Sequence, residues 1–254
     1  MLFAIGNIQF SPRLVPTLAA IATLALTLYL GAWQQGRAEL KRGLQADFMQ
    51  RTSAPALFLD SSMRDANLLN YRQAIARGEW VSEGQIFLDN KIDDVNSGRA
   101  GYHVITPLRL AGSNTYVLVN RGWVARSAHY PKPPMVTTPT GVIEVHGLNI
   151  VPNAHFLELS NAAIEGPVWQ NLTIERYRKA TKLEVLPIML LAAETLPDSQ
   201  QGLLRVTEQP NAGVDKHIEY MLTWYSLAAA VAALWIGLNI KRVAIQPSAQ
   251  SSLE

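Results

Sequence analysis

The chain has 254 residues, 48% of them hydrophobic, and its 22 Lys and Arg against 20 Asp and Glu leave a net charge of +2. Residues 34–219 hold equal numbers of each sign, so this neutral region lacks the basic footprint that nucleic acid requires. The absence of cysteine excludes disulfides, covalent haem attachment through C-x-x-C-H and copper delivery by thiolates.

The first predicted element is a transmembrane helix over residues 14–36, a stretch without any charge. At about 1.5 Å per residue such a helix spans roughly 35 Å, enough for a hydrocarbon core of about 30 Å. Tyr29 and Trp33 stand near its end, where aromatic side chains anchor helices in the interface. A buried core helix and a cleaved signal peptide are the alternatives. We expect residues 37–49, rich in helix formers, to extend this helix into water.

A period of two, typical of strands, begins at residue 71, after a loop and a short turn or helix in residues 52–69. Strands are predicted at residues 71–81, 85–92, 101–110, 116–124 and 141–150, with a hairpin turn at 111–114. Pro107 has no N–H to donate to a ladder, so it indicates an edge or a bulge. Five or six short strands favour a small barrel or a sandwich.

The rest of the central region contains a loop, a helix and one more strand. Residues 130–140 include four prolines and are typical of a surface loop. Residues 173–182 are predicted to form a short amphipathic helix capped by Thr173, followed by a strand at 185–191. We therefore expect a membrane protein of the α+β class, in which two transmembrane helices flank a mostly β domain with one short helix.

The second predicted transmembrane helix covers residues 220–240, which again carry no charge. The positive-inside rule counts short tails, so it places tails 1–13 and 241–254 in the cytoplasm and residues 37–219 on the opposite side. Arg37, Lys41 and Arg42 beside the first span argue for the reverse orientation.

Signatures of catalysis and metal binding are absent from the sequence, which has no nucleotide-binding loop, H-E-x-x-H or nucleophile elbow. Residues 93–94 are both Asp, but neighbours on a strand point to opposite faces, so a solvated turn is favoured over a carboxylate pair. Four histidines lack metal-ligand spacing and are interpreted as surface or strand histidines: His103, His129, His146 and His155. The sequence thus indicates a protein that is not an enzyme.

His217 stands at the mouth of the second span and is interpreted differently. Tyr220, Met221, Trp224 and Tyr225 follow it at helical spacing and share its face. A neutral imidazole can ligate haem iron while the flat macrocycle lies against aromatic rings. The alternative is a histidine that anchors the interface as its aromatic neighbours do.

Arg121 also has two interpretations. Its guanidinium can pair with a haem propionate as a forked donor. Alternatively, Asn120 and Gly122 form a turn or bulge and Trp123 packs in the core, which is the structural role that the sequence favours.

Four motifs follow one another along most of the chain: L-G-x-W-Q-x-x-R at 30–37, G-Y-H-V-x-T-P-L at 101–108, V-L-V-N-R-G-W-V at 117–124 and H-x-x-Y-x-x-T-W-Y-S-L-A at 217–228. With the two flanking spans, this ordered set resembles the Surfeit-locus (Surf-one) family of cytochrome c oxidase assembly proteins. The chain departs from the usual family pattern at Lys216, where an asparagine commonly stands, and at Glu219 and Met221.

The resemblance implies an assembly factor for haem-copper oxidases in the bacterial inner membrane, with the central domain in the periplasm. It implies haem a as a transient cofactor and His217 as the iron ligand; the other proposed haem-contacting residues are Tyr220, Trp224, Trp33 and Arg121. The implied partners are the oxidase catalytic subunit, haem a synthase and the lipid bilayer. The alternative function is a haem-independent membrane chaperone or scaffold for an oxidase subunit. A periplasmic hydrolase or signalling domain is a third, which lacks a catalytic constellation.

Overall fold

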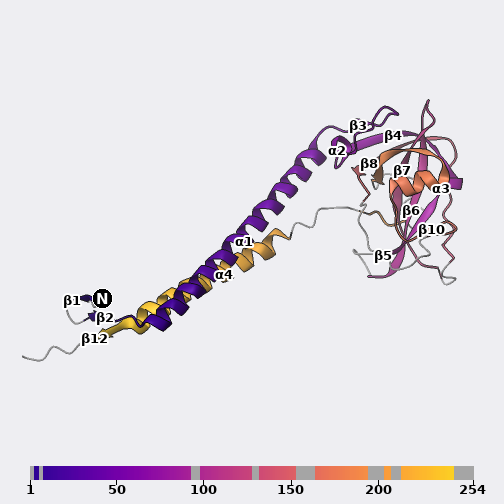
Figure 1. Cartoon of the computed structure of the whole chain (residues 1–254). Helices are drawn as coiled ribbons and strands as arrows, with labels where there is room; N and C mark the ends of the chain where they lie inside the picture. Colours follow the sequence, from indigo (N-terminus) through magenta and orange to yellow (C-terminus); the bar gives the residue numbers. More distant parts are fainter. Residues whose placement is uncertain are drawn as a thin grey trace, which may run out of the picture. The chain divides into compact units, whose positions relative to one another are not determined.

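The computed structural model describes residues 3–5, 8–92, 98–127, 132–152, 164–193, 203–206 and 213–242. The chain divides into two compact units. The first, called the helical unit, comprises Met1–Ala46 and Pro210–Glu254. The second, called the β domain, comprises Asp47–Gln209. Figure 1 shows their elements. Residues 93–94, His129 and His155, which the sequence analysis considered, lie outside the described residues.

Two long helices make up most of the helical unit: α1 (Leu14–Ser53) and α4 (Val214–Asn239). Both are long and apolar enough to cross a membrane, and only 11% and 6% of the residues in their most apolar windows are buried. Such exposure is unlike that of a core helix in a soluble protein. The predicted continuation of the first helix through residues 37–49 is confirmed, since α1 runs unbroken to Ser53.

The two helices lie side by side and antiparallel, as Figure 1 shows. At one end, Trp235 Nε1 donates to the hydroxyl oxygen of Thr17 at 3.2 Å. At the other end, Gln34 and His217 are in contact. Small side chains occupy the seam between these points, where short side chains let helix backbones approach closely. The buried ones are Thr27, Gly31 and Ala228, and Ala38 is buried one turn beyond Gln34.

A three-stranded sheet that the sequence analysis did not predict stands beyond the ends of these helices. It consists of β1 (Phe3–Ile5), β2 (Ile8–Phe10) and β12 (Ile240–Arg242), all paired antiparallel. The ring of Phe10 lies edge-on to that of Trp235, with centroids 5.5 Å apart. The sheet thus joins the segment that precedes α1 to the segment that follows α4.

The β domain is built on a nine-stranded sheet of order β3-β4-β8-β11-β7-β6-β5-β10-β9. An additional pairing of β4 with β6 closes a ring of five strands, β4-β8-β11-β7-β6. Of the two predicted architectures, a small barrel and a sandwich, the domain therefore has the barrel. All predicted strands are present. The strands are β3 (Leu57–Phe58), β4 (Gln73–Trp80), β5 (Ile86–Ile92), β6 (Ala100–Leu110), β7 (Thr115–Ala125), β8 (Val142–Ile150), β9 (Ile164–Glu165), β10 (Val168–Trp169) and β11 (Glu184–Ala192).

Pro107 lies inside β6, opposite Leu118 of β7, and it has no ladder partner on the other side of the strand, so the predicted edge is a local one. The first part of β6 pairs with β5 as far as Ile105, and its end pairs with β4 from Leu108 onward. Pro107 occupies the interval in which β6 changes partner. A residue without an N–H is tolerated there because no ladder bond is required of it.

Short helices cover the barrel. Besides α2 (Ala66–Leu69) and a 3-10 turn, Ser82–Gly84, the domain has α3 (Ile174–Thr181). The predicted cap of α3 is confirmed, because the Thr173 hydroxyl oxygen accepts from the backbone N–H of Arg176 at 3.0 Å. Tyr177 of α3 is fully buried, and its hydroxyl donates to the carbonyl of Gly84 at 2.7 Å. This bond fixes α3 against the barrel.

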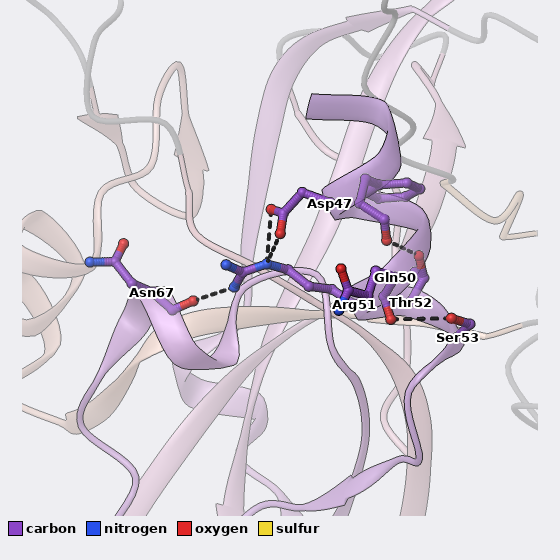
Figure 2. A network of polar contacts seen from close by, with 7 residues as sticks. Asp47, Gln50, Arg51, Thr52, Ser53 and Asn67 are labelled. Atoms are coloured by element: carbon purple, nitrogen blue, oxygen red, sulfur yellow. Dashed lines mark hydrogen bonds and ion pairs between the residues drawn. The ribbon is translucent and has the colours of Figure 1, made fainter. Parts of the chain in front are cut away.

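Arg51 connects the last turns of α1 with α2, as Figure 2 shows. Its Nε donates to both carboxylate oxygens of Asp47 at 3.0 and 2.9 Å, and its Nη1 donates to the carbonyl of Asn67 at 2.8 Å. The hydroxyl of Ser53 donates to the carbonyl of Gln50 at 3.1 Å. The Ser53 hydroxyl thus satisfies a carbonyl in the last turn of α1, and Arg51 satisfies one in α2, at helix ends that intrahelical bonds do not reach.

Candidate functional site

His217 lies in the first turn of α4. Gly213 adopts a left-handed conformation (φ 51°), which directs the chain into the helix at Val214. The helix therefore begins six residues before the predicted start of the span at residue 220, and it takes His217 into regular helical structure. The imidazole is half-buried, on the side of α4 that meets α1.

Gln34 is the partner of His217. Its Oε1 lies 2.7 Å from Nδ1 of the imidazole, and the two residues stand on different helices, 183 positions apart in the chain. Eight residues after His217 on α4, the Tyr225 hydroxyl donates to Oε1 of Gln35 at 3.4 Å. The Tyr225 ring lies against Gly31, where any β-carbon would stand 2.5 Å from it. Polar and close apolar contacts thus hold this part of the seam.

The aromatic residues proposed for haem contact are neighbours of this pair along the two helices. Tyr220 and Trp224 follow His217 by three and seven residues and share its side of the helix. Tyr220 is 58% exposed, and Trp224 is half-buried. Trp33, beside Gln34 in sequence, is 48% exposed, and the guanidinium of Arg37 lies 5.6 Å from its ring centroid. All four proposed haem residues of the helical unit therefore keep ring surface accessible or half-accessible.

Arg121 belongs to the β domain and is fully buried there. Its Nη1 donates to Oε1 of Gln85 at 3.0 Å, and its Nη2 donates to the carbonyl of Thr137 at 2.7 Å. The guanidinium also lies 5.2 Å from the ring centroid of Trp80. These contacts attach the proline-rich loop to the barrel. They are those of a residue with a structural role.

The N-R-G-W segment forms a β-bulge, as the structural interpretation of the sequence predicted. Opposite β6, Ile105 pairs with Asn120 and Val104 pairs with Gly122, so Arg121 is the extra residue. Gly122 has φ 138°, and a β-carbon there would stand 2.7 Å from the carbonyl oxygen of Leu204. Only glycine fits this position.

The histidines of the barrel have local roles. His103 of β6 is half-buried, with Nδ1 3.4 Å from Nδ2 of Asn120. Burial, assisted by the charge of Lys91, lowers its pKa to about 4. His146 is exposed and pairs with Glu144 at 2.7 Å. Within the described ranges, no group of three or more His, Cys, Asp or Glu residues is placed to hold a metal ion.

The residues around His217 fit an iron porphyrin in their donor chemistry. Nδ1 is engaged with Gln34, while Nε2 makes no hydrogen bond within the part of the chain that the structure describes. A neutral imidazole with one nitrogen held and the other free is the usual form of a haem ligand. The accessible rings of Tyr220 and Trp33 supply apolar surface on the same unit.

Gln34 is the residue that the sequence analysis missed. The motif at residues 30–37 contains it, but no role followed from the pattern. A signal was available, because Gln34 stands three residues after Gly31 and four before Ala38, two small and buried residues of α1. A polar side chain inside a small-residue stripe indicates a partner on the opposite helix.

Comparisons with known proteins cover most of the chain. Residues 21–229 match the model of the SURF1 family. Surfeit locus protein 1 of Takifugu rubripes is 26% identical over 234 residues, which cover 87% of this chain and 95% of that protein. The SURF1-like protein of Drosophila melanogaster is 28% identical over 239 residues, with 86% and 76% covered. The SURF1-like protein of Rickettsia felis is 23% identical over 222 residues, with 86% and 94% covered.

Proposed function

Because this chain belongs to the SURF1 family, we propose that it is an assembly factor for a haem-copper cytochrome oxidase, which holds haem a and assists its insertion into the catalytic subunit. The observation that carries the proposal is the half-buried imidazole of His217, held at Nδ1 by Gln34 and free of hydrogen bonds at Nε2 within the described residues.

Each residue of the helical unit has a defined task in this proposal. Nε2 of His217 would ligate the haem iron. The rings of Tyr220, Trp224 and Trp33 would offer flat apolar surface to the macrocycle. A single protein ligand suits a carrier, which must release what it holds. Arg121 has no place in this site, because its guanidinium is fully buried among groups of the β domain.

The proposed location is the bacterial inner membrane, with α1 and α4 as its spans and the β domain in the periplasm. The exposed apolar surface of both helices supports insertion into lipid. The charges of the tails, Arg13, Lys241 and Arg242 against Glu254, support a cytoplasmic position for both chain ends. The proposed protein partners are the oxidase catalytic subunit and haem a synthase.

The test is pigment carried by the purified full-length protein. The wild type, His217→Ala and His146→Ala are isolated in detergent from cells that make haem a, and their visible spectra are compared. We expect a Soret band with the wild type and with His146→Ala, whose imidazole is exposed on the barrel, and a strongly reduced or shifted band with His217→Ala. Equal pigment and equal spectra for all three proteins would show that His217 is not the ligand.

A haem-independent chaperone is the competing function. The exposed outer faces of α1 and α4 favour it equally, because they can hold the apolar helices of an oxidase subunit as well as lipid. Crosslinking to the catalytic subunit in cells that cannot make haem a distinguishes the two. Undiminished crosslinking there, together with a colourless purified protein, supports the chaperone.

A further inference from the structure

The contact between Gln34 and His217 has a defined direction. Oε1 of a carboxamide has lone pairs and no hydrogen, so it can only accept. With the carboxamide oriented as the structure has it, the nitrogen 2.7 Å away, Nδ1 of His217, carries the proton and donates it. In the neutral ring the lone pair then resides on Nε2.

This arrangement restricts the neutral imidazole of His217 to one of its two tautomers. A neutral imidazole exists as two tautomers, and only the form with an unprotonated Nε2 can use that atom as a ligand. Ligating histidines commonly donate their other ring N–H to an acceptor, which fixes both the tautomer and the orientation of the ring. Oε1 of Gln34 is such an acceptor, provided by the opposite helix.

The position of Gln34 is itself fixed by packing. It lies in the stripe of α1 that faces α4, between the buried residues Gly31 and Ala38. Gln34 is half-buried, whereas its neighbour Gln35 is exposed and bonds to Glu39 and Tyr225. Only the first of the two adjacent glutamines reaches His217.

We propose that Gln34 is a positioning residue, which holds His217 as the Nδ1–H tautomer and thereby presents Nε2 as the ligand atom. The consequence for haem rests on the function proposed above, whereas the control of the tautomer does not. The motif at residues 30–37 thus contributes to the same site as the motif at 217–228, although 180 residues separate them in the chain.

The first readout needs no haem. The full chain is labelled with ¹⁵N-histidine and studied in detergent at a pH at which histidine is neutral, and the His217 signals are assigned by their loss in His217→Ala. We expect a protonated Nδ1 and an unprotonated Nε2 in the wild type, in Gln34→Glu, which retains an acceptor, and in the matched control Gln35→Leu. We expect a mixture of tautomers in Gln34→Leu. A pure Nδ1–H form in Gln34→Leu would overturn the proposal.

The second readout is titration with ferric haem, followed by the Soret band. Loss of an outer partner of a metal-bound histidine typically weakens binding by about 10-fold to 100-fold, and we expect such a loss in Gln34→Leu but not in Gln35→Leu. Gln34→Met, closer in length, replaces Gln34→Leu if the latter does not fold. Unchanged binding in Gln34→Leu together with an altered tautomer would overturn the positioning role.

The two hypotheses fail in different ways. If His217→Ala binds haem as the wild type does, the ligand assignment of the proposed function is wrong, and the tautomer measurement still decides whether Gln34 controls the imidazole. If His217→Ala loses haem while Gln34→Leu keeps both its tautomer and its affinity, the proposed function stands and the role of Gln34 is refuted.

Discussion

Tyr225 lies so close to Gly31 that a β-carbon on residue 31 would stand 2.5 Å from Cε1 of its ring and 2.8 Å from Cδ1. The two residues come from the facing sides of α1 and α4, and Gly31 is buried by this contact. The absence of a side chain at residue 31 therefore sets how closely the two helices approach at the turn beside Gln34.

We predict that Gly31→Ala destabilises the helix pair. Overpacking of a close contact costs about 1–3 kcal/mol, more than the roughly 1 kcal/mol that alanine contributes through helix propensity. Gly36→Ala is the matched control on the same helix, because nothing lies within 4 Å of a β-carbon there. Thermal unfolding of the full chain in detergent should show a lower midpoint for Gly31→Ala only. Equal midpoints would contradict the packing described above.

Arg121→Met should destabilise the β domain severely. The substitution leaves the Thr137 carbonyl without its donor, removes one of the two donors to Gln85 Oε1 (the Thr106 hydroxyl remains), and removes the guanidinium from the Trp80 ring. Together these losses amount to about 3 kcal/mol or more. Urea unfolding followed by tryptophan fluorescence measures this cost.

Arg109→Met is the control for this experiment. Arg109 forms an ion pair with Glu79 at 2.5 Å in which both side chains are about half exposed, so its loss should cost no more than about 1 kcal/mol. A stable Arg121→Met protein that binds less haem than the wild type would refute the structural assignment of Arg121 and restore its role as a propionate partner.

The free energy of unfolding should decrease as the pH is lowered, because His103 is protonated more readily in the unfolded chain than in the folded one. The pKa of His103 is about 4 in the folded protein, against an ordinary value of 6.5, because burial disfavours the charged ring and Lys91 adds to this. Between these pH values the unfolded chain binds more protons, so the free energy of unfolding decreases as the pH is lowered, by on the order of 3 kcal/mol. Above pH 6.5 this contribution is fully present.

The pH dependence can be assigned by substitution. Urea unfolding at a series of pH values should give a flatter profile for His103→Gln than for the wild type. An unaltered slope in His103→Gln would mean that another group causes the acid sensitivity.

Substitution by leucine should affect stability differently at two buried asparagines. Asn149 is fully buried, and within the described residues neither atom of its amide has a hydrogen-bond partner. Asn120 is equally buried, but its Oδ1 accepts from the N–H of Gly122 at 3.0 Å. We expect Asn149→Leu to be neutral or to stabilise by up to about 1 kcal/mol, and Asn120→Leu to cost about 2 kcal/mol. Chemical denaturation of both variants checks this, and a large loss in Asn149→Leu would indicate a partner such as an internal water.

Local patterns predicted most elements because their causes are local. The period-two runs became β4 to β8, the cap at Thr173 depends on one bond over three residues, and Gly122 and Asn120 formed the expected bulge. Prediction was weakest for segments of two or three residues, such as the strands of the sheet β1-β2-β12, because so short a run has no periodicity. The missing N–H of Pro107 indicated a gap in pairing, but the cause of that gap, the change of partner along β6, is a property of the whole barrel.

The sequence by itself determined which segments this protein contains: two charge-free helical segments, a neutral region of short strands, and the ordered motifs that resemble one family. These features follow from hydrophobicity and from steric preferences of neighbouring residues, which are written in consecutive positions. Closure of the barrel by β4 and β6, burial of the charged Arg121 and the meeting of Gln34 with His217 were decided only by the tertiary structure. Each of these features brings together residues that are distant in the chain. The free energy of such contacts depends on tertiary packing, which a pattern of neighbouring residues does not predict.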